Sequence, residues 1–279
     1  MSTLITCYNY LSLNTLTLTS IRIDGNTMSA EMIDTFLSKP FPLLTKLDCK
    51  YSTISRIPEI QTLTSLNCSA CLGITSIPIL NNLVELDCNY CHRLINIPAL
   101  PNLTSLNCCE CFNLSSISEL PNLTVLDCYR CARLTGIPLL ESLTSLNCGE
   151  CTSLTSIPKL QSLTSLDCSG CTNITSIPKL RSLIELDCLD CTNLISIHPK
   201  LYRLIELDCC KCSKLNSIPL LHSLTTLYCC SSINLDSIYN LPNLTSLNGK
   251  LFISNRNINS ANTKTSNCKL RKNARIYVD

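Results

Sequence analysis

Eight cysteine pairs with the spacing Cys-x-x-Cys are the residues of this chain that could do chemistry. They are Cys68/Cys71, Cys88/Cys91, Cys108/Cys111, Cys128/Cys131, Cys148/Cys151, Cys168/Cys171, Cys188/Cys191 and Cys209/Cys212. Two neighbouring pairs would supply four thiolates, the ligand set of a structural zinc ion. A single pair at a helix N-terminus would instead suit thiol–disulfide exchange. The chain has 23 cysteines in 279 residues, so thiols are abundant enough for either chemistry.

The pairs recur because the whole chain repeats. The unit is LTSLNCGECTSLTSIPKLQS, residues 143–162, and further copies begin at Leu63, Leu83, Leu103, Leu123, Leu163, Leu183, Leu204, Leu224 and Leu244. Numbered from the first leucine, positions 1, 4, 12, 15 and 18 are Leu or Ile almost throughout, positions 6 and 9 are Cys, and position 16 is usually Pro. A fixed period of this length indicates stacked coils, each touching only its neighbours.

The repeat weighs against metal or redox chemistry. Rigid stacked strands would space the sulfurs by the strand separation, and four thiolates would place negative charge in an apolar stack. The pairs also follow a strand rather than opening a helix, and disulfides between coils would not persist in a reducing compartment. We therefore expect no cofactor, and interpret the thiols as buried packing, with the position-9 thiol also donating to a backbone carbonyl. At position 7, Cys109, Cys210 and Cys230 are expected to face outward and react with thiol reagents.

Three regions follow from the pattern. Residues 1–43 are expected to form an N-terminal cap with one atypical repeat, placing Leu13, Leu16 and Leu18 at positions 1, 4 and 6, and a short helix that begins after Ser29 and ends at Lys39-Pro40. Residues 44–248 form the array, with a short strand at positions 3 to 5 of each coil. Residues 249–279 are a basic C-terminal cap or tail.

The motif LxxLxCxxCxxLxxIPxLxx resembles the leucine-rich repeat in a short, twenty-residue form over residues 44–248. Its I-P-x-L return looks like that of bacterial effector repeats, and the regular Cys-rich array is similar to leucine-rich-repeat proteins of giant amoebal viruses. Cys at positions 6 and 9 departs from the usual aliphatic residue and Asn. The resemblance implies a curved, right-handed solenoid with a parallel sheet on its concave side, which binds proteins. The convex side should be irregular or polyproline-like, because twenty residues leave no room for a return helix.

Acidic residues gather at the sheet positions that should face outward. Position 5 is nearly always Asp or Asn, and with positions 3 and 8 it gives this face a net charge of about −8, although the whole chain carries +2. One interpretation is a solvated face kept soluble by its charge; the other is a surface for a basic partner or for the chain's own basic tail. Phosphates would meet carboxylates, so nucleic acid is not expected on this face. The candidate partner-binding residues are Asp87, Asp127, Asp167, Glu185, Asp187, Asp190, Glu206 and Asp208.

No catalytic constellation is evident, since the three histidines are scattered over turns and returns. We therefore expect a monomeric, non-enzymatic scaffold for protein–protein interaction. The alternative is the substrate-receptor subunit of a ubiquitin-ligase assembly, and zinc storage or redox buffering would rest on the thiols alone. The N-terminus has neither the basic start nor the apolar core of a signal peptide, and no run of about 18 apolar residues occurs. These features favour the cytoplasm, or a host's cytoplasm if the protein is viral, and no membrane partner.

Overall fold

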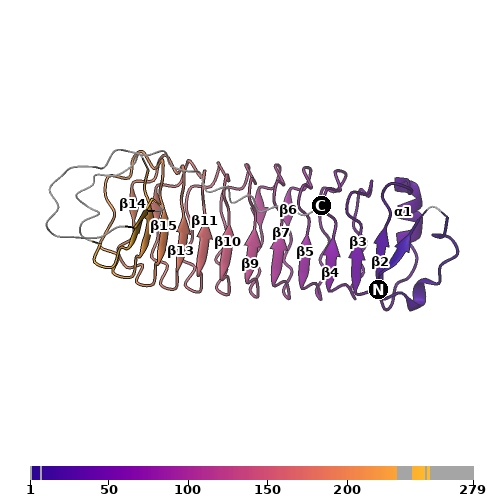
Figure 1. Ribbon diagram of the computed structural model, residues 1–279. Coiled ribbons are helices and arrows are strands. Elements are labelled where there is room, and N and C mark those ends of the chain that lie inside the picture. The colour runs from indigo at the N-terminus through magenta and orange to yellow at the C-terminus, as the bar shows by residue number, and fades with distance from the viewer. Residues whose placement is uncertain (1, 7, 231–240, 249, 252–279) are drawn as a thin grey trace.

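The coils of this chain stack into one elongated row (Figure 1). The computed structural model describes residues 2–6, 8–230, 241–248 and 250–251. Over these residues the fold is a parallel β-solenoid of about twelve turns, with one short helix at its N-terminal end. The repeat read from the sequence is therefore a structural repeat.

A 14-stranded sheet runs the length of the row, in the order β1-β2-β3-β4-β5-β7-β9-β10-β11-β13-β15-β16-β17-β18. Its strands are β1 (Thr3–Ile5), β2 (Ser20–Ile23), β3 (Lys46–Asp48), β4 (Ser65–Asn67), β5 (Glu85–Asp87), β7 (Ser105–Asn107), β9 (Val125–Asp127), β10 (Ser145–Asn147), β11 (Ser165–Asp167), β13 (Glu185–Asp187), β15 (Glu206–Asp208), β16 (Thr226–Tyr228), β17 (Ser246–Leu247) and β18 (Lys250–Leu251). Every neighbouring pair is parallel except β17 and β18. The expected strands at positions 3 to 5 are confirmed from β3 to β16.

Equivalent repeat positions lie side by side across the sheet. Leu146 on β10 pairs with Leu126 on β9 and Leu166 on β11, and all three are buried. Leucines at positions 1, 4, 12 and 18, isoleucine at 15 and cysteines at 6 and 9 fill one continuous core. The extra residue at His198 does not disturb this register, because Glu185 still pairs with Glu206. The return segment absorbs the insertion, so the sheet keeps its alignment.

Side chains facing outward also tie successive coils together. The Thr hydroxyl at position 2 donates to the position-2 carbonyl of the preceding coil, as Thr144 does to Thr124 at 3.0 Å. The Asn amide at position 11 donates in the same way, as Asn173 does to the carbonyl of Thr152 at 2.8 Å. These hydrogen bonds recur once per coil. Neighbouring coils are therefore held together by polar contacts at the surface as well as by apolar packing in the core.

The return side is less irregular than expected. Two short parallel pairs form there, between β6 (Asn96–Ile97) and β8 (Ser116–Ile117), and between β12 (Ser176–Ile177) and β14 (Ser196–Ile197). These segments are extended as they approach position 16, and extended backbones at the coil spacing can exchange hydrogen bonds. The curvature and handedness of the coil stay predictions.

The N-terminal helix is confirmed, but the register before it is not. Helix α1 (Ala30–Leu37) begins after Ser29, whose side chain accepts a hydrogen bond from the Met32 amide, and buries Ile33, Phe36 and Leu37. Strand β2 pairs with β3, the first strand of the predicted array, and its Ile21 lies opposite Leu47. Leu18 therefore stands at position 1, not 6, and the expected register is wrong by five residues. The alternation of Leu and Thr fits more than one frame. A short 3-10 helix, Thr15–Thr17, stands where the expected register would put the strand.

Position 8 has a backbone requirement that the residue types did not reveal. In coil after coil it takes a left-handed conformation, with φ between 54° and 67°, at Tyr51, Ala70, Tyr90, Glu110, Arg130, Glu150, Gly170, Asp190 and Lys211. This conformation is costly for residues other than glycine. It turns the position-8 amide toward the next coil, where the Glu150 N–H donates to the carbonyl of Ser169 at 2.6 Å. No β-branched residue occupies the position, which is the signal that the sequence carried.

The predicted basic tail, residues 249–279, lies outside the described residues apart from β18. Within the residues that are described, no helix is both long and apolar enough to cross a bilayer.

Candidate functional site

The cysteine pairs form two buried ladders joined by hydrogen bonds between coils. Each position-9 thiol donates to the carbonyl oxygen of the position-6 cysteine in the preceding coil, at 3.0 to 3.1 Å. The donors are Cys71, Cys91, Cys111, Cys131, Cys151, Cys171, Cys191 and Cys212. The expected thiol-to-carbonyl bond therefore exists, but it reaches the neighbouring coil and acts as a staple.

The position-6 thiols are held in their protonated form. The pKa of the position-6 thiols is raised well above its usual value. The larger cause is a hydrogen bond with the position-9 thiol of the next coil, and the second cause is burial. This holds for Cys49, Cys68, Cys88, Cys108, Cys128, Cys148, Cys168 and Cys188. Such thiols stay protonated at neutral pH, whereas metal binding and thiol exchange both need thiolates. No group of three or more metal-ligating side chains gathers anywhere in the described residues.

Cys71 differs from the other position-9 thiols because the preceding coil has Ser52 instead of Cys. The Ser52 hydroxyl lies 3.5 Å from the Cys71 sulfur. Hydrogen bonds from Cys49 and Ser52 lower the pKa of Cys71 to about 7. The side chain is fully buried, however, and its own S–H donates to the carbonyl of Cys49 at 3.0 Å. A thiolate there would break the staple and would still be shielded from any substrate.

The position-7 cysteines do not face solvent as expected. Cys109 and Cys210 are each 1% exposed, and Cys230 is half-buried. The Cys210 sulfur accepts a hydrogen bond from the Cys230 amide at 3.0 Å. Position 7 forms its own ladder at the coil spacing, which leaves little surface for a side chain as small as Cys. The prediction of reactive thiols at Cys109 and Cys210 is therefore wrong.

The position-5 acids have a structural role that their residue type and spacing did not indicate. One side-chain oxygen of each accepts a hydrogen bond from the backbone amide two residues later, which closes the turn after the strand. The bonds are Asp87 to Asn89 at 3.2 Å, Asp127 to Tyr129 at 3.3 Å, Asp167 to Ser169 at 2.9 Å, Asp187 to Leu189 at 2.9 Å and Asp208 to Cys210 at 2.9 Å. Asn147 makes the same bond to Gly149 at 3.1 Å. Asp and Asn alternate at position 5 because either side chain supplies this oxygen.

Six candidate residues gather at one end of the sheet face. Asp167, Asp187 and Asp208 are direct neighbours on β11, β13 and β15, and Glu185 pairs with Glu206 two residues earlier in the strands. Asp190 stands in the turn that follows β13. Glu185 is exposed, whereas the others are half-buried. We call Asp167, Glu185, Asp187, Asp190, Glu206 and Asp208 the acidic cluster.

Asp87 and Asp127 lie apart from this cluster. They sit on β5 and β9, with Asn107 of β7 between them. Burial raises the pKa of Asp87, against an opposing hydrogen bond from the Asn89 amide. These two aspartates therefore read as turn-closing residues, and the structure does not join them to the acidic cluster.

Part of the remaining acidic charge is neutralised locally. Arg130 contacts Glu150 at 2.7 Å and Glu110 at 3.6 Å, from the same repeat position in the coil between them. The Tyr129 hydroxyl donates to Glu150 at 2.6 Å, and burial together with this carboxylate raises the Tyr129 pKa to about 12. The sheet face thus carries a paired cluster in its middle, and its acidic potential is concentrated near β11, β13 and β15.

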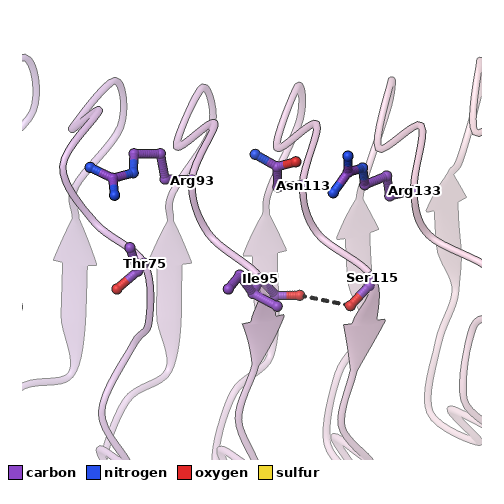
Figure 2. Close-up of a pocket in the computed structure, with 6 residues that line it drawn as sticks. All are labelled: Thr75, Arg93, Ile95, Asn113, Ser115 and Arg133. Atoms are coloured by element: carbon purple, nitrogen blue, oxygen red, sulfur yellow. Dashed lines mark hydrogen bonds between the residues drawn. The ribbon is translucent and has the colours of Figure 1, made fainter.

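A hollow of about 390 Å³ lies on the return side, lined by Thr75, Arg93, Ile95, Asn113, Ser115 and Arg133 (Figure 2). The Ser115 hydroxyl donates to the carbonyl of Ile95 at 3.2 Å on its floor. Arg93 and Arg133 stand at position 11 of coils two apart and lean the same way. Among the described residues, no carboxylate lines the hollow. The sequence carries this feature as Arg, Asn and Arg at position 11 of three consecutive coils.

No family model matches this chain, and neither does any curated protein or solved structure. The class that the fold itself defines is a parallel β-solenoid with Cys-containing repeats of about twenty residues.

Proposed function

We propose that this chain is a non-enzymatic interaction scaffold that binds a basic protein segment over the acidic cluster on β11, β13 and β15. The observation that carries the proposal is the strand register, which stacks three aspartates and two glutamates on adjacent strands. Like charges at this spacing repel one another and destabilise the sheet. A basic partner would relieve that repulsion, so its binding is favoured beyond simple attraction.

We also propose that the coil is a leucine-rich repeat. Strands at positions 3 to 5 and buried side chains at positions 1, 4, 6, 9, 12, 15 and 18 support this reading. In that family position 9 is normally Asn, and here its Cys thiol donates to the backbone carbonyl of the preceding coil. A reducing compartment, such as the cytoplasm expected from the sequence, would keep these thiols in the donor form.

The experiment must separate charge from turn closure. Asp→Asn at positions 167, 187 and 208 removes three charges but keeps the oxygen that closes each turn. Glu185→Lys with Glu206→Lys reverses charge at two residues that stand at position 3, two residues before the turn-closing position 5. Binding of a fluorescent polylysine peptide would be measured by anisotropy at increasing ionic strength. Glu119→Lys, an exposed change on the return side, is the matched control.

Both sets of variants should weaken peptide binding on the order of tenfold or more, since each exposed charge pair contributes about 0.2–1 kcal/mol. The control should bind as the unaltered chain does. Added salt should weaken peptide binding by the unaltered chain toward the level of the variants, because exposed charges are screened beyond about 10 Å at 0.1 M salt. Equal peptide binding by all of the proteins would refute the acidic cluster as a partner site.

A further inference from the structure

Charge is segregated to opposite sides of the coils that carry the acidic cluster. Between residues 143 and 223 every acidic residue stands at a sheet-side position, 3, 5 or 8: Glu150, Asp167, Glu185, Asp187, Asp190, Glu206 and Asp208. With the exception of Lys211, every Lys and Arg in the same stretch stands on the return side: Lys159, Lys179, Arg181, Lys200, Arg203 and Lys214. These coils therefore have an acidic face and a basic face.

The basic face has a regular core. Lys159, Lys179 and Lys200 occupy the same place in three consecutive coils, each directly after a proline. The side-chain amide of Gln161 donates to the carbonyls of both Lys159 and Lys179, at 3.2 and 3.3 Å, so the two lysine-bearing segments are tied together. Desolvation, then the charges of Arg181, Lys200 and Lys159, lower the pKa of Lys179. We call Lys159, Lys179, Arg181, Lys200 and Arg203 the basic row.

The basic row and the acidic cluster repeat with the same spacing, because both repeat once per coil, about 4.8 Å along the row. We propose that the basic row is an interaction surface for the acidic cluster of a second copy of this chain. The cluster spans the coils that begin at Leu163, Leu183 and Leu204, and the row spans those at Leu143, Leu163 and Leu183. Two copies laid face to back, with their rows parallel and displaced by one coil, bring carboxylates over ammonium groups coil by coil.

Nucleic acid fits the basic row less well. Phosphates of one strand in a duplex rise about 3.4 Å each, which falls out of step with a 4.8 Å row after two or three groups. Single-strand sites add successive aromatic side chains on which bases stack. Among residues 152–162, 172–182 and 192–203, which form the return side here, Tyr202 is the one Phe, Tyr or Trp.

The geometry of this contact has a consequence for assembly. It joins two different faces, so each added copy presents a fresh face and the association does not close on itself. Self-association should therefore increase with protein concentration, proceed beyond dimers and be reversed as the salt concentration rises. The inference rests on the acidic cluster being an interaction face, as proposed above, and it replaces the expectation of a monomer.

The test is sedimentation velocity on the full chain at low and high ionic strength, under reducing conditions. The acid-reversed variant carries Glu185→Lys and Glu206→Lys, and the base-reversed variant carries Lys159→Glu, Lys179→Glu and Lys200→Glu. Each variant alone should lose the concentration-dependent increase in sedimentation coefficient that the unaltered chain shows at low salt. An equal mixture of the two should associate again, at least to heterodimers, because the intact basic row of the acid-reversed variant can meet the intact acidic cluster of the base-reversed variant. Thermal melting confirms that both are folded, and Lys→Gln at the three lysines is the milder substitute should the base-reversed variant melt early.

A chain that stays monomeric at low salt overturns the inference, and so does a mixture that fails to associate. Polylysine binding separates this failure from failure of the proposed function. The Lys→Gln variant keeps its acidic cluster and gains no carboxylate, so if it binds the peptide while the unaltered chain stays monomeric, only the second-copy inference fails. A single-stranded oligonucleotide is the remaining arm: binding by a monomeric chain that the base-reversed variant loses would assign the row to nucleic acid and overturn the inference.

Discussion

The thiol of Cys151 donates a hydrogen bond to the carbonyl oxygen of Cys128 in the preceding coil, at 3.1 Å. The same carbonyl accepts the amide of Cys131 within its own coil at 3.2 Å. One buried oxygen thus closes a turn and joins two coils. The cysteines therefore act as hydrogen-bonding staples as well as small apolar groups.

Removing one staple should weaken the stack. Cys151→Ala deletes a buried hydrogen bond, worth about 0.5–1.5 kcal/mol, and leaves a small cavity, so we expect a loss of about 1–3 kcal/mol in unfolding free energy. Urea denaturation under reducing conditions measures it. Ser153→Ala, on the return side of the same coil, is the control and should change stability by less than about 0.5 kcal/mol. A Cys151→Ala protein as stable as this control would contradict the stapling role.

Alkaline pH should destabilise the fold more than its carboxylates and lysines alone would predict. The position-6 thiols have pKa values raised well above the ordinary value in the folded chain, as at Cys148, whereas unfolded cysteines titrate near about 8.5. The unfolded state therefore loses protons first, so stability is fully present below about pH 8.5 and falls as pH rises from there toward the folded pKa.

Each such thiol contributes a slope of about 1.4 kcal/mol per pH unit across that window. Urea midpoints between pH 7 and 10, with a phosphine reductant present, would show the decline. Cys148→Val removes one titrating thiol and should make the slope shallower by about that amount. A stability that stays flat through pH 10 would show that the ladder thiols ionise as readily folded as unfolded.

The left-handed backbone at position 8 predicts opposite effects for two reciprocal substitutions. Gly170 has φ of 67°, and a Cβ there would lie 3.0 Å from Cγ of Glu150. Gly170→Ala should therefore cost about 1–2 kcal/mol. Ala70, at φ of 55°, is strained in the same way, and Ala70→Gly should stabilise by up to about 1 kcal/mol despite the added freedom of the unfolded chain. Thermal melting of the two variants measures both effects. Melting temperatures that shift in the same direction would contradict a shared backbone requirement at position 8.

The turn-closing role of Asp187 can be separated from its charge. Asp187→Asn keeps an oxygen for the Leu189 amide, 2.9 Å away, so stability should be unchanged or rise slightly as repulsion with Asp167 and Asp208 falls. Asp187→Ala leaves that amide without its side-chain partner and should cost about 1 kcal/mol. Chemical denaturation of both variants provides the comparison. Equal stability of the Asn and Ala proteins would mean that the charge, not the turn, explains the residue.

The periodicity of the sequence predicts most of the fold. Leu146 and Cys148 were placed in the core by repeat position alone, and the strands, the helix cap at Ser29 and the inward thiols all followed from local pattern. The repeat register of the N-terminal segment could not be predicted, because the Leu-Thr alternation before Ser20 fits several registers. Only the pairing of β2 with β3 shows which register is adopted.

The sequence by itself determined the coil, its strand positions and the residues that face inward, because a period of twenty leaves each apolar side chain one place to be buried. Only the tertiary structure decided what the polar residues do. Whether Cys109 is exposed, whether Asp187 closes a turn, and which acids share a patch all depend on contacts between coils. Those contacts join atoms of residues about twenty positions apart. They form only when one coil stacks on the next, so residue type alone does not predict them.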